Sequence, residues 1–375
     1  MKNRLIIIGS FLSIVGFSSC DRLLEVTPPN ETLAEDALKT PEDLQKMLNS
    51  CYDVLANSLN GRTQIFNELL GDNLNAPRNN DDFREIYNRS SNFFNNTVGS
   101  LYADYYIAVF RVNVMLAAFD QIPALSDAEE NRMRAEGYFV RALSYFELVK
   151  LWAQPYGYSS GNGHPGIVIR SEATQNPLPR NTVEQVYNQI ISDLEFAANN
   201  LPDNNGNYAD KVAARALLAK VYFQMNRFDK VIENVDIVVN SGRFSLSDSL
   251  NRFNNTATQS EYIFTFISTS NNDNRARTFV DNYRSDNNAT PQLTVTQEFY
   301  DLVNSSASDQ RARFFTINNP GTENEAYVTT KFNQDFFSVP YLHLTELLMM
   351  RAEAYGELNI NLDQARTDLN DIMER

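Results

Sequence analysis

The chain has 375 residues, and its 47 Asp and Glu against 32 Lys and Arg give a formal net charge of −15. This charge argues against a nucleic-acid-binding protein, because neutralising phosphates requires clustered Lys and Arg, and two His and two Cys leave too few ligands for a zinc or haem site. With 43% hydrophobic and 11% aromatic residues, the chain can build a core and lacks the composition of a disordered protein.

The first residues have the pattern of an export signal. Lys2 and Arg4 precede an apolar stretch from Leu5 to Phe17, and small residues then lead to Cys20. The stretch is shorter than the roughly 20 residues that a membrane-spanning helix needs, and a buried N-terminal helix is the alternative interpretation. We expect residues 1–19 to be a signal peptide.

Cys20 is the expected point of attachment to a membrane. The sequence Phe17-Ser18-Ser19-Cys20 resembles a lipobox, at which a lipoprotein signal peptidase cuts. Lipidation of Cys20 would anchor the mature chain by several acyl chains, with residues 20–40 as a tether. Cys51 then has no disulfide partner, and we expect it to be a buried, unreactive thiol.

Residues 41–375 are predicted to form one mainly helical domain, with an N-terminal part over 41–200 and a repeat-containing, variable part over 201–375. Thr40 and Pro41 are typical of a helix start, because threonine caps the first turn and proline suits the first helical position. A polar stretch over 71–96 follows the first helix. The apolar spacing predicts helices over 44–55, 101–119, 127–152, 183–200, 208–225, 228–239, 341–358 and 362–373, with short strands such as 262–267 within 250–318.

Three pairs of these helices have the length and spacing of tetratricopeptide-like units. In the clearest pair, 208–225 is joined to 228–239 by a short turn, and Val231 stands where such repeats usually have Ala. The last two helices form a second pair, with Ala365 at the corresponding small position. The third pair combines 127–152 with 183–200 across a long Gly/Pro-rich connection. The pattern therefore predicts a scaffold of stacked helix pairs.

Several motifs, in order along the chain, resemble those of the SusD-like (RagB/SusD) family of outer-membrane lipoproteins. The segment Arg134–Val149 is similar to the family's R-x-E-x-x-F-x-R-A-x-x-Y-F-x-L-V helix. Further matches are Pro179–Tyr187, Lys211–Tyr222, Asp309–Arg311 and Leu344–Ala354. Asn370–Arg375 resembles a motif after which the family's chains continue, so we expect a C-terminally truncated member.

The resemblance implies both a fold and a function. The implied fold is mainly α, with tetratricopeptide-like helix pairs forming a right-handed superhelical scaffold and with irregular, loop-rich and short β insertions. The implied protein is exposed at the cell surface, anchored in the outer membrane through Cys20, and captures oligosaccharide nutrients. It passes them to a TonB-dependent SusC-like transporter. No cofactor or metal is implied, and some relatives handle peptides instead of glycans.

The polar stretch over 71–96 carries the residue types that hold neutral sugars. Aromatic rings stack on the apolar faces of a sugar, and amides and carboxylates bond to its hydroxyls. Gly71-Asp72 also matches a pair at the corresponding position in the family. The predicted ligand-binding residues are Asp72, Asn73, Arg78, Phe83, Tyr87, Asn92, Phe93 and Phe94, together with Tyr283 in the variable part. The alternative is that these aromatic side chains pack the long loop onto the helices, as we expect Trp152 to pack in the core.

Two other classes of protein compete with a binding protein. Glycoside hydrolysis requires two carboxylates across a cleft, and no motif singles out a pair. His164 and His343 have no catalytic partner in the sequence, so we expect no enzyme. A pure tetratricopeptide-like scaffold would explain the helices but would leave the export signal and the polar aromatic loops without a role.

Overall fold

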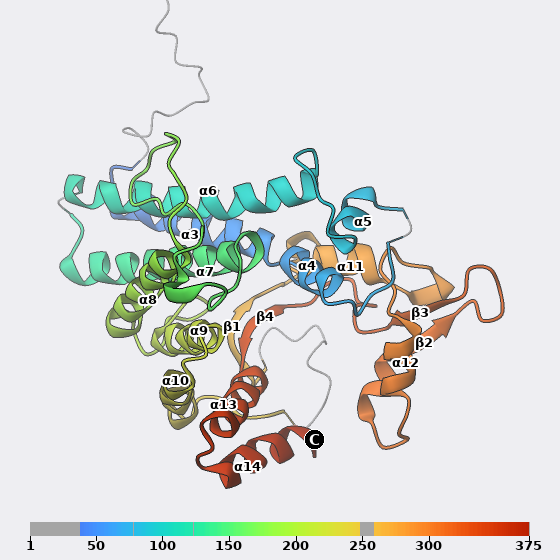
Figure 1. Ribbon diagram of the computed structural model, residues 1–375. Coiled ribbons are helices and arrows are strands. Elements are labelled where there is room, and N and C mark those ends of the chain that lie inside the picture. Colours follow the sequence, from blue (N-terminus) through green and yellow to red (C-terminus); the bar gives the residue numbers. More distant parts are fainter. Residues whose placement is uncertain (1–37, 78, 123, 248–258, 375) are drawn as a thin grey trace, which may run out of the picture.

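A computed structural model of the chain describes residues 38–77, 79–122, 124–247 and 259–374 (Figure 1). The predicted signal peptide, the lipidation site Cys20, most of the tether and Arg78 lie outside the described residues. The helices are α3 (Pro41–Ser58), α4 (Arg62–Leu70), α5 (Asp81–Tyr87), α6 (Asn96–Ala118), α7 (Asp127–Trp152), α8 (Val183–Asn200), α9 (Lys211–Gln224), α10 (Phe228–Asn240), α11 (Arg277–Tyr283), α12 (Gln297–Val303), α13 (Leu344–Leu358) and α14 (Leu362–Met373).

Local capping explains where the long helices begin. The Thr40 side chain accepts a hydrogen bond from the Asp43 amide, while the Asp43 carboxylate accepts one from the Thr40 amide. Ser126 and Thr182 form the same reciprocal capping box at the starts of α7 and α8. These caps occupy backbone donors that a helix cannot satisfy internally, and both helices match the predicted ranges 127–152 and 183–200.

The helices stack in pairs, as the repeat pattern predicts. α9 and α10 pack together across a short turn, α13 and α14 do the same, and α7 packs along α8. α8 also contacts α9, and α10 contacts α13, so the pairs form one continuous stack (Figure 1). At the other end, α3 and α6 pack on each other and on α7. The mainly helical fold of stacked pairs is therefore confirmed.

The variable part adds two antiparallel strand pairs. β1 (Tyr262–Phe266) pairs with β4 (Val339–His343), and β2 (Phe315–Asn318) pairs with β3 (Ala326–Thr329). The prediction that a helix begins at Tyr341 is wrong, because Tyr341–His343 belongs to β4 and the helix starts at Leu344. The helix predicted over 208–225 begins instead at Lys211, where the Asp210 side chain caps it. The short helix α5 lies in the stretch predicted to be a polar loop, α11 and α12 lie in the segment predicted to hold short strands, and α4 lies where no element was predicted.

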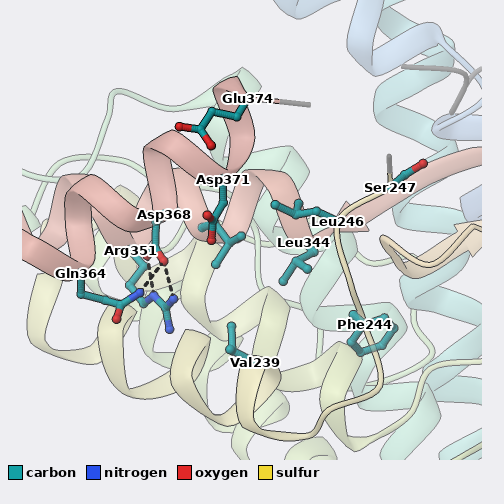
Figure 2. A pocket seen from close by; sticks show the side chains of 11 residues that line it. Val239, Phe244, Leu246, Ser247, Leu344, Arg351, Gln364, Asp368, Asp371 and Glu374 are labelled. Atoms are coloured by element: carbon teal, nitrogen blue, oxygen red, sulfur yellow. Dashed lines mark hydrogen bonds and ion pairs between the residues drawn. The ribbon is translucent and has the colours of Figure 1, made fainter. Parts of the chain in front are cut away.

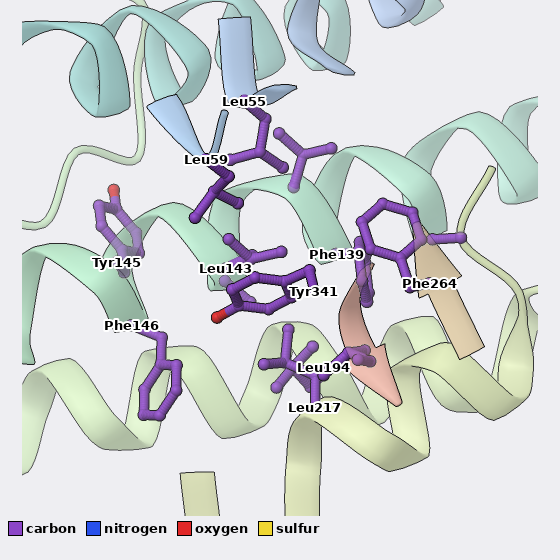
Figure 3. Packing of buried hydrophobic residues seen from close by; sticks show 14 of the residues in the cluster. Leu55, Leu59, Phe139, Leu143, Tyr145, Phe146, Leu194, Leu217, Phe264 and Tyr341 are labelled. Atoms are coloured by element: carbon purple, nitrogen blue, oxygen red, sulfur yellow. The ribbon is translucent and has the colours of Figure 1, made fainter. Parts of the chain in front are cut away.

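One hydrophobic core joins the helix stack to the β1–β4 pair. Figure 3 shows side chains of α3, α7, α8 and α9 converging on Phe264 of β1 and Tyr341 of β4. Leu55, Leu143 and Leu217 are fully buried there, and each such side chain contributes about 1.5–3 kcal/mol on burial. Within the described part of the chain, no helix combines the length and apolar character that crossing a bilayer requires.

Candidate functional site

The structure brings the two segments that carry the predicted ligand-binding residues side by side. Leu74 forms an antiparallel bridge with Val295. The Asn75 side-chain amide donates to the Val295 carbonyl at 2.7 Å and to the Thr294 hydroxyl at 3.1 Å. In Figure 1, α4 and α5 accordingly lie next to α11. The polar stretch and the variable part therefore share one face of the molecule.

Two of the predicted aromatic residues are buried on this face. Phe83 is 6% exposed and belongs to the main core cluster, and Tyr283 is 5% exposed. The Tyr283 ring lies 5.0 Å from Phe332 and 6.4 Å from Phe279, centroid to centroid. Both rings are therefore covered by protein in this structure: Phe83 packs the polar stretch onto the core, and Tyr283 packs α11 against Phe332. Tyr87 is partly buried against the same core.

The polar residues at the start of the stretch are exposed and paired with neighbours. Asp72 accepts from Arg89 at 3.0 Å, and both side chains are more than half exposed. Asp72 has a φ of 61°, a left-handed conformation that Asp tolerates better than most residues. The Asn73 amide donates to Glu68 at 3.0 Å. These two side chains reach solvent, although the structure does not place them in the cavity described below.

Phe93 and Phe94 stand out from the surface just before α6. They are 95% and 82% exposed, and their rings meet edge to face at 5.6 Å. The Asn92 amide donates to Glu85 at 3.0 Å, and its carbonyl oxygen accepts from the Phe94 amide at 2.8 Å. Asn95 caps α6 and donates to the other Glu85 oxygen at 2.9 Å. Polar contacts thus hold an exposed aromatic pair in place.

A cavity of about 370 Å³ opens beside this pair; we call it the Trp152 cavity. It is lined by Asn92, Phe93, Asn95, Val98, Gly99, Tyr102, Trp152, Ile167 and Arg180. The Tyr102 and Trp152 rings meet edge to face at 5.2 Å. Trp152 is only partly buried, which differs from the expectation that it lies in the core. The cavity therefore joins three aromatic rings to two amides and a guanidinium.

The walls of the Trp152 cavity are fixed by hydrogen bonds to the backbone of the 153–182 connection. Arg180 donates to the Trp152 carbonyl and to the Gly166 carbonyl, each at 2.6 Å. Tyr106, whose ring lies 4.9 Å from Tyr102, donates to the Val168 carbonyl at 3.0 Å and accepts from its amide at 3.1 Å. Burial raises the pKa of Tyr106, so its hydroxyl stays protonated.

Tyr102, Trp152 and Arg180 were not among the predicted site residues. Tyr102 and Trp152 sit on predicted helices, where an aromatic residue is more often core, and Arg180 lies in a loop more than 20 residues further along. One signal in the sequence could have indicated the site. The single tryptophan of the chain ends its helix immediately before a long Gly/Pro-rich connection, and such a helix end is rarely covered on all sides.

A larger cavity of about 760 Å³ lies against α13 and α14 (Figure 2). The guanidinium of Arg351 in this cavity is already paired with two carboxylates, through two bonds to Asp368 at 2.7 and 2.8 Å and one to Asp236 at 2.8 Å. The other described lining residues are aliphatic, acidic or, at Ser247 and Gln364, uncharged polar, and Phe244 is the one aromatic residue among them. Its described residues therefore offer a single aromatic ring for stacking on a sugar, against three in the Trp152 cavity.

The two histidines and Cys51 have structural roles. The Nδ1 atom of His164 lies 2.7 Å from the Ser159 hydroxyl in a turn, and His343 caps α13. Cys51 is fully buried, and burial raises the pKa of its thiol to about 12. A thiol with that pKa is protonated at neutral pH and therefore unreactive.

Comparisons with known proteins agree with the fold. A SusD-like family described as starch-binding and associating with the outer membrane matches residues 22–223. SusD-like proteins P38 and P2 of Formosa agariphila are 24% and 29% identical to this chain over 251 and 283 residues. These alignments cover 66% and 70% of this chain but 47% and 52% of the relatives. The chain thus spans about half the length of the curated relatives it matches.

Solved structures resemble nearly the whole chain. A SusD superfamily protein from Bacteroides thetaiotaomicron has a TM-score of 0.78 at 21% identity, covering 90% of this chain and 80% of its own. A laminarin-binding SusD-like protein has a TM-score of 0.72 at 19% identity, covering 89% and 84%. At these identities the likeness concerns the fold. Together with the family match over more than half of its residues, it shows that the chain belongs to the SusD-like family.

Proposed function

We propose that the protein binds oligosaccharide at the surface of the outer membrane and passes it to a TonB-dependent SusC-like transporter. The observation that carries the proposal is the Trp152 cavity, where the exposed Phe93 ring stands beside Tyr102 and Trp152. Exposed aromatic rings are costly in water unless a partner covers them. The apolar face of a pyranose ring is such a partner.

The polar lining of the cavity suits the hydroxyls of a neutral sugar. The amides of Asn92 and Asn95 and the guanidinium of Arg180 lie around the aromatic rings. Amides both donate and accept hydrogen bonds, as sugar hydroxyls do, and the guanidinium adds donors. The cavity volume of about 370 Å³ lies at the lower end of the range for small-molecule sites. It therefore fits a short stretch of a longer glycan that continues along the exposed Phe93–Phe94 pair.

Delivery to a transporter and anchoring through Cys20 are supported by the family rather than by any contact in the structure. The matching family is described as associating with the outer membrane. Cys20 follows an apolar stretch and two serines, as at a lipoprotein cleavage site. In the proposed arrangement the lipid holds the protein beside the transporter, and the face that carries the Trp152 cavity binds the glycan.

Binding can be measured directly because Trp152 is the only tryptophan of the chain and lines the cavity. We expect titration of the full chain with malto- or laminari-oligosaccharides to shift its fluorescence and to saturate. These sugars are chosen because the family is described as starch-binding and one structural neighbour as laminarin-binding. No saturable change with these sugars or with xylo- and manno-oligosaccharides would refute glycan binding in this cavity.

Phe93 and Phe94 provide a matched pair of variants. Both are almost fully exposed, so replacing either by Ala leaves the fold intact, but only Phe93 lines the cavity. We expect Phe93→Ala to weaken binding about tenfold, which corresponds to ~1.4 kcal/mol. Phe94→Ala is expected to have a smaller effect. Equal affinities for wild type and Phe93→Ala would remove Phe93 from the site.

The partner and the anchor require separate tests. Purification in mild detergent from the native membrane is expected to retain a barrel transporter with the protein, and a preparation without one would contradict the proposed delivery. The variant Cys20→Ala is expected to move from the membrane fraction to the soluble fraction. If it stays in the membrane fraction, Cys20 is not the anchor.

A further inference from the structure

A second cavity, of about 590 Å³, lies between α3, the 201–210 loop and β1; we call it the Tyr208 cavity. It shares no lining residue with the Trp152 cavity. α3 contributes exposed Asn49 and Asp53, the loop contributes Asn207 and Tyr208, and β1 with the segment after it supplies the remaining wall. Neither the family motifs nor the proposed function assigns a role to this cavity.

One wall of the Tyr208 cavity is a supported aromatic surface. Tyr208 is 38% exposed, and its ring lies 5.1 Å from that of Tyr52 at an interplanar angle of 59°. Tyr52 is buried, lies 6.3 Å from Phe264, and its hydroxyl accepts from the Ala209 amide at 3.2 Å. The exposed Tyr208 ring therefore packs against the Tyr52 ring, which is itself held in place by Phe264 and by the hydrogen bond to the Ala209 amide. Such a surface can stack on the apolar face of a sugar without a loss of side-chain freedom.

Another part of the lining carries one cation that is paired with two carboxylates. Arg275 donates to Asp53 at 2.7 Å and forms an ion pair with Asp273 at 3.1 Å. Arg275 is the one cation among the described residues that line the cavity. Because two carboxylates already engage it, an anionic ligand would gain no free positive charge here. The two carboxylates leave one net negative charge and further acceptor capacity, so the cavity favours an uncharged ligand rich in hydroxyl donors over an anionic one.

Thr265, which lines the same cavity, has a buried hydroxyl without a hydrogen-bond partner among the described residues. The Oγ1 atom of Thr265, in β1, is inaccessible and makes no hydrogen bond to any part of the chain that the structure describes. Burying a hydroxyl without a hydrogen bond is unfavourable. In the present rotamer no ligand atom reaches Oγ1. Thr265 is partly exposed and lines the cavity, so rotation about χ1 would turn the hydroxyl toward a ligand hydroxyl, which can both donate and accept.

We propose that the Tyr208 cavity is a second binding site for a short neutral oligosaccharide. The sugar stacks on Tyr208, bonds to the Asp53–Arg275 pair through its hydroxyls, and satisfies Thr265. The volume of the Tyr208 cavity, about 590 Å³, lies well inside the range of small-molecule sites. The site acts independently of the Trp152 cavity, so the chain holds a glycan at two places and gains avidity for a long polymer.

The two cavities can be distinguished by calorimetry combined with fluorescence. The full chain is titrated with hexasaccharides of the malto, laminari, xylo and manno series. Calorimetry counts all the sites, whereas the fluorescence of Trp152 reports its own cavity. In the variant Phe93→Ala, whose Trp152 cavity binds about tenfold more weakly, we expect one tighter site to persist. Adding Tyr208→Ala is expected to abolish that binding, and Thr265→Val to weaken it at least fivefold.

Two features keep the test decisive. Thr265→Val keeps the shape of the side chain and removes only the unpaired hydroxyl, so the variant folds. Tyr158→Ala is the control for Tyr208→Ala, because Tyr158 is 64% exposed and lines neither cavity; it is expected to bind as wild type does.

The proposal is overturned if Phe93→Ala abolishes all binding, while wild type binds one sugar with a fluorescence change; the Trp152 cavity then stands alone. It is also overturned if Tyr208→Ala and Thr265→Val both bind as the parent variant does, or if none of the sugars binds. Tyr208-dependent binding of an uncharged tetrapeptide without binding of any of these sugars would also overturn it. Tyr208-dependent binding without a fluorescence change would instead refute only the proposal for the Trp152 cavity.

Discussion

Replacing Arg141 by Met is expected to be among the most destabilising single changes in the helix stack. Arg141 lies on α7 and donates to both oxygens of Asp193 on α8, each at 2.8 Å. A third bond, at 3.0 Å, reaches the side-chain oxygen of Asn113 on α6. The guanidinium therefore ties three helices together at one point.

The magnitude follows from burial. The side chains of Arg141 and Asp193 are 9% and 3% exposed, so solvent screens their attraction little. Removing one partner of such a pair leaves a buried charge uncompensated and costs about 3–5 kcal/mol. Replacing both, as in Arg141→Met/Asp193→Leu, removes the charges together and is expected to recover most of that loss.

The loss also depends on pH. Burial raises the pKa of Asp193, and Arg141 opposes this effect. Without Arg141 the pKa of Asp193 rises further, so the folded variant keeps a proton that the unfolded chain releases above about pH 4. The variant is therefore least impaired near pH 4, and its deficit relative to wild type grows as the pH rises.

Urea unfolding followed by circular dichroism measures these changes. Arg134→Met is the matched control on the same helix, because Arg134 pairs with Glu130 at a partly exposed site and such pairs contribute about 1 kcal/mol or less. The reasoning is refuted if Arg141→Met is as mild as Arg134→Met. It is also refuted if the double variant is no more stable than Arg141→Met.

Three further changes test other parts of the structure. Gly61→Ala is expected to lower the free energy of unfolding by about 1–3 kcal/mol in the same urea assay. The reason is that Gly61 has a φ of 120° and an added Cβ would lie 2.9 Å from the Phe279 amide nitrogen. Unchanged stability would contradict this. Cys51 is expected to resist a thiol reagent at pH 8 until urea unfolds the chain, measured in a variant without the other cysteine; rapid labelling of the native protein would contradict its burial. Tyr341→Phe is expected to lose about 1–3 kcal/mol, because the buried Glu147 carboxylate loses a donor; a neutral effect would show that Lys150 suffices.

Local signals explain which elements could be predicted from the sequence. The helix over 127–152 was predicted to the residue because its cap, Ser126, lies beside it in the chain. The strand β4 was missed because its evidence is not local. Tyr341–His343 forms a strand because it pairs with β1, some 80 residues earlier. The sequence pattern alone does not separate an apolar run from the helix that follows it.

The site shows the same limit more sharply. Phe83 and Phe93 stand ten residues apart in one polar stretch, and the sequence gives no reason to treat them differently. The first is buried in the core and the second is 95% exposed. Trp152 and Arg180 meet Phe93 only because the connection after α7 folds back, with Arg180 bonded to the Trp152 carbonyl. Residue type indicated the chemistry of the site, whereas tertiary contacts determined its members.

The exposure of Phe93 is itself an argument for a ligand, because hydrogen bonds on either side of Phe93 hold the loop that carries it in one conformation. The Asp82 carboxylate accepts from the amide and the hydroxyl of Thr97 at 3.0 and 2.7 Å, and Glu85 accepts from Asn92 and Asn95 on either side of the aromatic pair. Carboxylates of α5 thus accept four hydrogen bonds, two from the loop and two from the first turn of α6, and hold a loop whose apolar rings face water. A loop without a partner would gain by folding those rings inward, as Phe83 does. Holding them outward in one geometry lowers the entropy cost of stacking on a sugar, which is the property that a glycan-binding surface needs.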